Sequence, residues 1–467
     1  MPQTSPAIVL DPSDPAAWTV HSVDELLSLR REGVDAAQRA ALSRRFAALR
    51  PAVDALDKLA TKQGIERVEE IADVVPVLFD HRVYKAYPLS LIEKRNFKRL
   101  TAWLGRLTTH DLSAIPLDGL RSVDAWLDRL DEHEMIIGHS TGTTGKLSFI
   151  PRSQVEWPAW KNAYFEVLRA ALGIDTRVEK IPNLSASGYR SGHQMMTKMG
   201  RLFGRASAGG EANRHMVNDY PLSSDLLSLA GRLQAAEERG ELDQLTLDPE
   251  LLAERRAFIE AAAHREEDLQ SWFVKVAEEF RGQRIRIGGT YADLVRLALK
   301  GREQGIVCEF AEGSLLMGGG GFKGYRDAPS DWRQLLMDFF GIGRIHSMYG
   351  MSECMGTAPL CSAGYFHFQP YAIPIVLDED FRPLPADGVQ TGRLALYDLL
   401  AETYWGGFIS SDRVTMHWDY ACACGWKGPR VDQDIARFGE LKGGDDKITC
   451  AGTGKAYSDF MDYVGQA

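Results

Sequence analysis

The sequence has little cysteine, no excess of basic residues and no long hydrophobic run. Six cysteines in 467 residues are too few for a disulfide-stapled scaffold and are typical of a reducing compartment. No stretch approaches about 18 uninterrupted apolar residues, so we expect no membrane span. The N-terminus lacks the basic start and apolar run of a signal peptide. These absences predict a soluble, cytoplasmic protein.

The net charge of the chain is −10, because 64 acidic residues outweigh 54 basic ones. A nucleic-acid-binding protein needs a dense basic face to neutralise phosphates, so this charge argues against that class of function. Apolar residues make up 45% of the chain and charged residues 25%, which is typical of a globular protein. A chain of this length can bury a full core without covalent staples.

The pattern along the chain predicts four regions. Residues 1–130 carry apolar residues mostly at helical spacing, and we expect this region to pack on the core. Residues 131–370 alternate strand and helix patterns, which predicts an α/β core. Residues 371–440 hold short strands separated by turn residues, so we expect a small β subdomain that forms a partly closed barrel. Residues 441–467 form a short tail.

The same periodicities predict individual elements. We expect helices at residues 23–33, 36–49, 52–64, 154–173, 224–240, 248–280, 292–300 and 330–340, the last with Ser330 as its N-cap. We expect strands at residues 134–140, 147–151, 284–287, 307–310, 315–317, 345–349, 373–377, 392–397 and 413–418. The aromatic segment 74–88 is typical of a packed connector.

The most distinctive segment is a loop between two predicted strands. It consists of Ser140, Thr141, Gly142, Thr143, Thr144, Gly145 and Lys146. Glycines let the backbone approach a ligand and turn its N–H groups inward, while hydroxyls and an ammonium add donors for phosphate oxygens. The loop therefore predicts a phosphate-binding site, and the alternative is a polar hairpin loop that binds nothing.

This loop does not fit the Walker P-loop, which requires G-x-x-x-x-G-K-[ST] followed by a helix. Ser140 stands where the first glycine is required, and Leu147 stands where a serine or threonine is required. The segment that follows is predicted to be a strand. We therefore exclude the P-loop fold.

The loop instead resembles the phosphate-binding signature of the adenylate-forming superfamily: acyl-CoA synthetases, firefly-type luciferases and nonribosomal-peptide adenylation domains. Other segments resemble motifs of that superfamily in the same order: the glycines at 318–321, Y-G-x-[ST]-E at 349–353, Asp412, and D-D-x-I at 445–448. The C-x-C-G segment at 422–425 resembles one in phenylacetate-CoA ligases and in the acyl-protein synthetase of bacterial luminescence. The resemblance spans roughly residue 134 to the end of the chain.

The resemblance implies an α/β fold with two α/β subdomains and a small β-barrel subdomain. It implies an ATP-dependent, AMP-forming ligase, in which a small carboxylic acid attacks the α-phosphorus of ATP to give acyl-AMP and pyrophosphate. The acyl group would pass to CoA, to an amine or amino acid, or to a protein thiol. The alternatives are an acyl-protein synthetase that needs a protein partner, and a non-catalytic nucleotide-binding homologue.

The resemblance also implies roles for single residues. Thr143, Lys146 and Glu353 would act in catalysis, with Glu353 holding Mg²⁺, a hard cation that prefers carboxylate oxygens. The nucleotide-binding residues would be Ser140, Thr141, Gly142, Thr144, Gly145, Gly318, Gly319, Gly320, Tyr349, Gly350, Ser352, Asp412 and Arg437. Tyr349 would lie against adenine, and Asp412 would accept hydrogen bonds from both ribose hydroxyls. The alternatives are core packing for Tyr349 and a turn position for Asp412.

Two assignments within this pattern stay open. Arg437 matches a ribose-contacting arginine, but the family's compact G-R-x-D-D is here interrupted by residues 438–444, so another residue could fill the role. By position, Tyr189, Gly192, His193 and residues 319–322 could line the acyl pocket. A lone histidine such as His193 is also typical of a structural role.

Three cysteines and a histidine form a candidate metal set. Cys361 and His367 precede the β subdomain, and Cys422 and Cys424 lie within it. Three thiolates and an imidazole suit tetrahedral Zn²⁺, and such a site would be structural because protein ligands fill all four positions. The alternative is a group of reduced, buried thiols.

The tail departs from the superfamily, whose members carry a mobile C-terminal domain that supplies a lysine. Only 21 residues follow Asp446, too few for such a domain, so we expect it to be lacking here. Either it is lost, or another polypeptide supplies it, or Lys447 or Lys455 acts locally.

Overall fold

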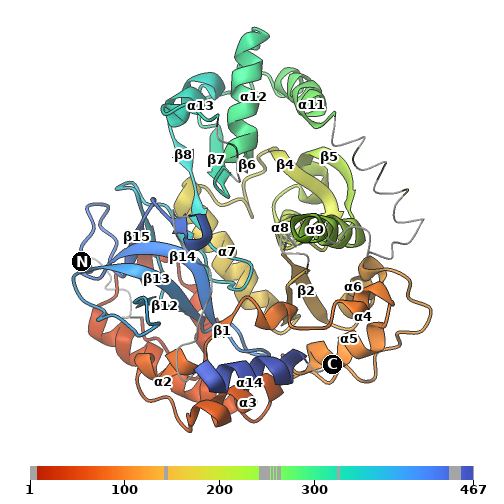
Figure 1. The fold of residues 1–467 in the computed structure, drawn as a ribbon. Coiled ribbons are helices and arrows are strands. Elements are labelled where there is room, and N and C mark those ends of the chain that lie inside the picture. The colour runs from red at the N-terminus through yellow and green to blue at the C-terminus, as the bar shows by residue number, and fades with distance from the viewer. Residues whose placement is uncertain are drawn as a thin grey trace. The chain divides into compact units, whose positions relative to one another are not determined.

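The computed structural model describes residues 8–140, 146–240, 264–322, 325, 327–440 and 454–465, together with the single positions 253, 256 and 259 (Figure 1). The chain divides into two compact units. Unit 1 contains Met1–Gly138, Ser148–Ala170 and Tyr349–Ala467, and unit 2 contains His139–Leu147 and Ala171–Met348. Strands β2 (Met135–His139) and β9 (Met348–Tyr349) and helix α7 (Trp157–Leu172) carry the chain from one unit to the other.

Unit 2 is built on a five-stranded sheet in which neighbouring strands are parallel. Its strands, in order across the sheet, are β5 (Arg214–Leu222), β4 (Asn183–Gly192), β6 (Arg286–Thr290), β7 (Leu315–Gly319) and β8 (Ile345–His346). Parallel neighbours need crossover connections, and helices supply them. The helical elements of unit 2 are α8 (Met195–Ala206), η4 (Gly210–Asn213), α9 (Ser224–Arg239), α11 (Arg265–Glu279), α12 (Tyr291–Glu303) and α13 (Trp332–Phe340).

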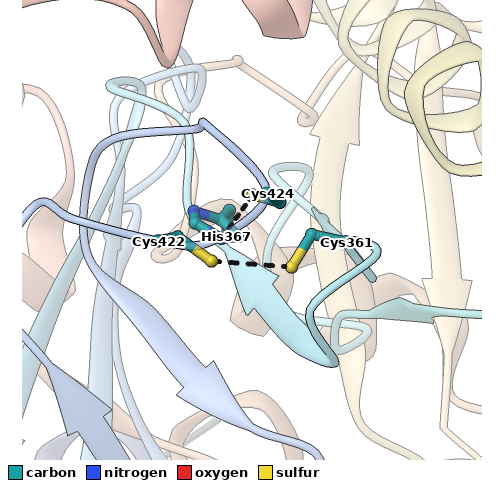
Figure 2. Close-up of side chains that lie close together, drawn as sticks. All are labelled: Cys361, His367, Cys422 and Cys424. Carbon is teal, nitrogen blue, oxygen red and sulfur yellow. Dashed lines mark hydrogen bonds between the residues drawn. The ribbon is translucent and has the colours of Figure 1, made fainter.

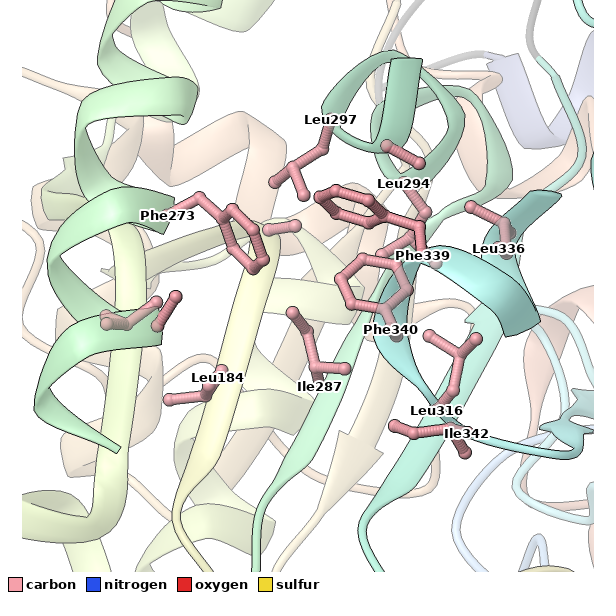
Figure 3. Packing of buried hydrophobic residues seen from close by; sticks show 14 of the residues in the cluster. Leu184, Phe273, Ile287, Leu294, Leu297, Leu316, Leu336, Phe339, Phe340 and Ile342 are labelled. Carbon is pink, nitrogen blue, oxygen red and sulfur yellow. The ribbon is translucent and has the colours of Figure 1, made fainter. Parts of the chain in front are cut away.

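The core of unit 2 lies between this sheet and the helices α11, α12 and α13 (Figure 3). Phe273 from α11 and Phe339 and Phe340 from α13 meet Ile287 of β6 and Leu316 of β7 in this core. The apolar residues of α12 that face the core recur at intervals of three and four, which places them on one face of the helix. Burial of this face holds the helices on the sheet.

Unit 1 contains a seven-stranded mixed sheet, whose path runs β11 (Tyr365–His367), β15 (Arg430–Asp432), β14 (Gly407–His417), β13 (Val389–Asp398) and β12 (Ala372–Leu377). Neighbours along this path are antiparallel. Two short strands pair with β14 as well: β1 (Phe79–Asp80) in parallel and β16 (Ala436–Arg437) antiparallel. The strands β2 and β3 (Phe149–Ser153) form a separate pair, and β10 (Ala358–Pro359) precedes β11.

Helices make up most of the first third of unit 1 (Figure 1). They are η1 (Pro15–Val20), α1 (Val23–Leu26), α2 (Arg31–Leu49), α3 (Asp54–Gln63), η2 (Ile71–Val77), η3 (Val83–Lys85), α4 (Ser90–Glu93), α5 (Phe97–Gly105) and α6 (Val123–Glu132). The elements η6 (Phe438–Glu440) and α14 (Gly454–Gly465) come last. Helix α14 packs on α3, with Lys62 paired to Asp459 at 2.8 Å. Among the described residues, no helix combines the length and the apolar character needed to cross a membrane.

The mixed α/β class that the sequence predicts is confirmed, and most predicted elements are present within a few residues. Three details are wrong. The predicted helix 23–33 is two helices, because α1 ends at Leu26 and α2 begins at Arg31. Helix α13 begins at Trp332 after Asp331, so Ser330 is not its N-cap.

The third error is the strand predicted at 307–310, which the structure does not contain. The segment makes single backbone hydrogen bonds instead: Gly282 donates to Glu309, and Ala311 donates to Gln283. Val307 is 71% exposed, so its apolar side chain adds nothing to a buried face. Of the helix predicted at 248–280, the second part is present as α11, and most of residues 248–263 lie outside the described residues.

Helix packing predicts opposite effects of alanine substitutions at two helical glycines, Gly301 in unit 2 and Gly33 in unit 1. A Cβ at Gly301 would lie 2.4 Å from Cζ of the buried Phe339 ring, so G301A should destabilise the fold by about 1–3 kcal/mol through overpacking. Gly33 is exposed in α2 with nothing within 4 Å, so G33A should stabilise it by about 0.5–1 kcal/mol. Urea unfolding measures both, and equal shifts in the two variants would contradict this packing.

Candidate functional site

In unit 1, a tyrosine, an aspartate and an arginine from separate segments lie together. The hydroxyl of Tyr349 donates to Oδ2 of Asp412 at 2.7 Å, and Nε of Arg437 lies 3.9 Å from Oδ1 of the same carboxylate. Burial, together with Asp412, raises the pKa of Tyr349 well above its ordinary value, which keeps the hydroxyl a donor. The tyrosine ring also contacts Phe366 and Phe368, with centroids 5.9 and 6.2 Å away.

Strand pairing explains how Arg437 reaches this group. Asp412 on β14 and Arg437 on β16 are directly opposite in the antiparallel register, so their side chains emerge side by side. Residues 438–444, which interrupt the motif, follow the paired strand and leave this register unchanged. An oriented aromatic ring, a carboxylate and a largely exposed guanidinium can together bind a base and its sugar hydroxyls.

Glu353 lies four residues beyond Tyr349 and is partly buried. Burial raises the pKa of this carboxyl and Asp412 raises it further, while Arg152 and Arg437 lower it. A carboxylate whose charge is disfavoured by its surroundings gains from a cation beside it. The residues present therefore fit a hard divalent cation such as Mg²⁺ at Glu353.

Two buried charged residues adjoin this segment, and the sequence analysis did not single them out. Arg152, on β3, donates from Nη2 to the carbonyl oxygen of Ser352. Asp398, at the end of β13, accepts hydrogen bonds from the backbone N–H groups of Met355 and Leu400 at 2.5 and 3.0 Å. The signal that could have found Arg152 is a charge within a strand that is otherwise apolar or small.

Unit 2 holds the remaining candidates. Gly318 and Gly319 end β7, and Gly320 follows with φ of +69°. A Cβ at Gly318 would lie 2.2 Å from the ring of Tyr291, so packing alone requires glycine there. Nothing lies within 4 Å of a Cβ at Gly319, so that position leaves room for a ligand.

The base of the candidate phosphate loop is held by His139. Its Nδ1 donates to the carbonyl of Ser140 at 2.6 Å, its Nε2 pairs with the hydroxyl of Ser224 at 2.9 Å, and its backbone N–H donates to His193 at 3.1 Å. Burial lowers the pKa of Lys146, at the other end of the loop, so an anion beside it would be favourable. Thr141, Gly142, Thr143, Thr144 and Gly145 lie outside the described residues.

The residues proposed for an acyl pocket have structural contacts in unit 2. His193 is buried, and its Nδ1 lies 3.3 Å from Nζ of Lys198. Burial, with Lys198 beside it, lowers the pKa of His193 to about 2, so its ring is neutral at physiological pH. The ring of Tyr189 packs on Tyr220, and a Cβ at Gly192 would lie 2.6 Å from the carbonyl oxygen of Leu222.

A second constellation in unit 1 brings together three cysteines and a histidine (Figure 2). Sγ of Cys361 lies 3.9 Å from Sγ of Cys422, and Sγ of Cys424 lies 3.7 Å from Nε2 of His367. All four ligand atoms lie within 4.8 Å of one another. In tetrahedral zinc sites, bond lengths near 2.3 Å to sulfur and 2.0 Å to nitrogen imply ligand edges of about 3.5–3.8 Å. The cluster therefore fits Zn²⁺.

Strand pairing also forms this cluster. His367 lies on β11, and Cys422 and Cys424 lie in the turn between β14 and β15, which are consecutive strands of the sheet. Burial and Arg430 lower the pKa of His367 to about 4, so the ring is neutral and able to bind a metal. None of the five described cysteines is in a disulfide, and Cys308 and Cys354 lie outside the cluster.

The sequence matches no family model, and no curated protein matches it. Solved structures do match. A 2-hydroxyisobutyryl-CoA ligase in complex with 2-HIB-AMP and CoA is 13% identical, with a TM-score of 0.51 over 88% of this chain and 69% of that one. At this identity the similarity concerns the fold alone: the chain shares the fold of this ligase.

Two other solved structures match a smaller part of this chain. ATP-bound MatB from Rhodopseudomonas palustris is 16% identical, with a TM-score of 0.34 over 65% of this chain. The amide bond synthetase McbA from Marinactinospora thermotolerans is 12% identical, with a TM-score of 0.31 over 63% of this chain. Each of these two matches covers 48% of the matched chain.

The structure groups the predicted residues by unit. In unit 1 it brings Tyr349, Asp412 and Arg437 together. Glu353 lies close enough that the charges of Asp412 and Arg437 shift its pKa. Gly350, next to Tyr349, packs against Thr357. The hinge residues predicted at 445–448 lie outside the described residues, and so does the side chain of Lys455.

The metal cluster predicts that purified protein contains about one zinc ion per chain. C424S should lower the zinc content and the thermal unfolding temperature, because a structural metal binds only the folded state. C308S is the matched control, since that thiol is half-buried and lies outside the cluster. Elemental analysis and calorimetry measure both, and a stable wild type free of metal would contradict the assignment.

Proposed function

We propose that this protein is an ATP-dependent, AMP-forming carboxylate ligase. The observation that carries the proposal is the hydrogen bond from Tyr349 to Asp412, opposite Arg437 and near Glu353. These residues occupy the positions where the sequence resembles the nucleotide motifs of the superfamily. The adenylate-forming fold supports the same reading.

Each of these residues has a task in the proposed reaction. The ring of Tyr349 stacks on adenine, and the carboxylate of Asp412 accepts hydrogen bonds from the ribose hydroxyls, with Arg437 beside it. Thr141, Thr143, Thr144 and Lys146 donate to the phosphates and stabilise the charge that grows on the leaving pyrophosphate. Glu353 holds Mg²⁺, which supplies charge neutralisation at the phosphates when it is bound. Holding the acid against the α-phosphorus then makes the attack effectively unimolecular.

The proposal includes a small carboxylic acid as substrate and CoA, an amine or amino acid, or a protein thiol as acceptor. The C-x-C-G segment favours the branch of phenylacetate-CoA ligases and acyl-protein synthetases, which leaves both CoA and a protein thiol open as acceptors. It also includes a structural Zn²⁺ at Cys361, His367, Cys422 and Cys424. Free thiols at these positions suit a reducing compartment, so a cytoplasmic location belongs to the same proposal.

The first test concerns Glu353, the proposed protein ligand of the Mg²⁺ ion that accompanies ATP. E353Q should leave the fold intact and slow ATP–pyrophosphate exchange by about a hundredfold or more, because the metal contributes several kcal/mol at the transition state. E69Q, at an exposed glutamate of unit 1, is the control. Exchange is measured across a panel of carboxylic acids, and wild-type rates in E353Q would show that Glu353 does not hold the metal.

The second test concerns the candidate phosphate loop at residues 140–146. T143A and K146A should each slow exchange about ten- to a hundredfold, because a charge-assisted donor in a dry site contributes about 1.5–3 kcal/mol. The loss should appear equally in kcat and kcat/KM, since these donors meet charge that develops only in the transition state. The exposed Lys275 supplies the control, K275A.

The same assay separates the alternatives. Equal exchange in wild type, T143A and K146A would remove the loop from the phosphate site. A non-catalytic homologue exchanges with no acid, even as wild type. An acyl-protein synthetase exchanges normally but releases product only after a specific protein is added, which mass spectrometry of the products detects.

A further inference from the structure

Arg152 is fully buried, on a strand of unit 1 whose five residues are all buried. Among the contacts of its guanidinium, Nη2 donates to the carbonyl of Ser352, Nε donates to the hydroxyl of Tyr404 at 3.3 Å, and Cζ lies 4.7 Å from the ring centroid of Trp160. A planar guanidinium with several donors can hold a fixed geometry that a lysine cannot.

The strand that carries Arg152 is itself held in place. The buried carboxylate of Glu156 accepts from the backbone N–H and the hydroxyl of Ser153 at 2.9 and 2.7 Å. It also accepts from the backbone N–H of Thr403 at 2.7 Å. Ser153, next to Arg152, and Thr403, next to Tyr404, are therefore joined through the carboxylate of Glu156. This link fixes the distance between the side chains of Arg152 and Tyr404.

Asp398 holds the same segment from its other end. Its Oδ2 accepts from the backbone N–H of Met355 at 2.5 Å and lies 3.4 Å from that of Gly356, while Oδ1 accepts from Leu400 at 3.0 Å. Asp398 is 1% exposed, so water does not compete for these bonds. Arg152 thus binds the backbone just before Glu353, and Asp398 binds it just after.

We propose that Arg152 and Asp398 are positioning residues for Glu353. They fix the backbone of residues 352–356 from both sides, so the carboxylate is oriented before a metal–nucleotide complex arrives. This inference rests on the proposed function, in which Glu353 is the Mg²⁺ ligand, and neither Arg152 nor Asp398 is assigned a contact with the reacting groups.

The experiment compares three variants of the full chain in ATP–pyrophosphate exchange. R152Q removes the charge and the planar guanidinium, so its kcat should fall about tenfold or more. R152K keeps the charge but not the planar guanidinium, so its kcat should fall as well. D398N weakens the carboxylate that accepts from the N–H groups of Met355 and Leu400, so it should also lower kcat.

A binding measurement accompanies these rates. Mn²⁺ binding in the presence of a non-cleavable ATP analogue, followed by electron paramagnetic resonance, should weaken about tenfold or more in R152Q. R214K is the matched control, because Arg214 is a buried arginine of unit 2, 3% exposed and paired with Glu211 at 2.7 Å. It should retain wild-type exchange and Mn²⁺ affinity.

The outcomes separate the inference from the proposed function. Wild-type exchange and Mn²⁺ affinity in folded R152Q and R152K would overturn the inference alone. If R152Q does not fold, R152K and D398N decide: unchanged kcat and Mn²⁺ affinity in both variants overturn the inference, and a fall in both quantities supports it. A wild type that exchanges with no acid and binds no Mn²⁺–nucleotide would overturn the proposed function, and the inference with it.

Discussion

The pairing of β14 with four other strands sets the geometry of unit 1. Along its eleven residues, β14 pairs first with β1, then with β16, then with β15, while β13 lies along its other edge. The contact with β16 places Arg437 opposite Asp412. The contact with β15 closes the turn that carries Cys422 and Cys424. A shift of one residue would turn every one of these side chains to the opposite face, so the register of β14 determines both constellations.

The two constellations share the segment of β11. His367 is directed at the cysteine cluster (Figure 2), whereas its neighbours Phe366 and Phe368 contact the ring of Tyr349. Side chains alternate along an extended chain, so a ligand on one side fixes the aromatic residues on the other. A metal bound at the cluster would therefore also immobilise Phe366 and Phe368, the two rings that contact Tyr349. The segment of β11 thus links the proposed structural metal site to the proposed adenine site.

Much of the candidate site could be predicted from sequence because its residues occur in short motifs. Tyr349 and Glu353 share one motif, and Cys422 and Cys424 share another, so local spacing is enough to find them. Arg152 and Asp398 belong to no motif and act through backbone atoms of a distant segment. The same limit hid the pairing of Phe79 with Phe408, since local periodicity indicates that a strand exists but not which strand it joins.

Burying the charges of Arg152 and Asp398 costs folding free energy, and this cost argues that the two residues position the segment around Glu353. Removing an arginine and a carboxylate from water carries a penalty that mutual attraction often fails to offset, and apolar residues of similar volume are frequently as stable or more so. Apolar side chains at 152 and 398 could fill the same space but could not bind the carbonyl of Ser352 or the N–H of Met355. The backbone around Glu353 would then lose its hydrogen-bond partners and its fixed direction. The pair therefore contributes geometry at this segment that hydrophobic packing cannot supply.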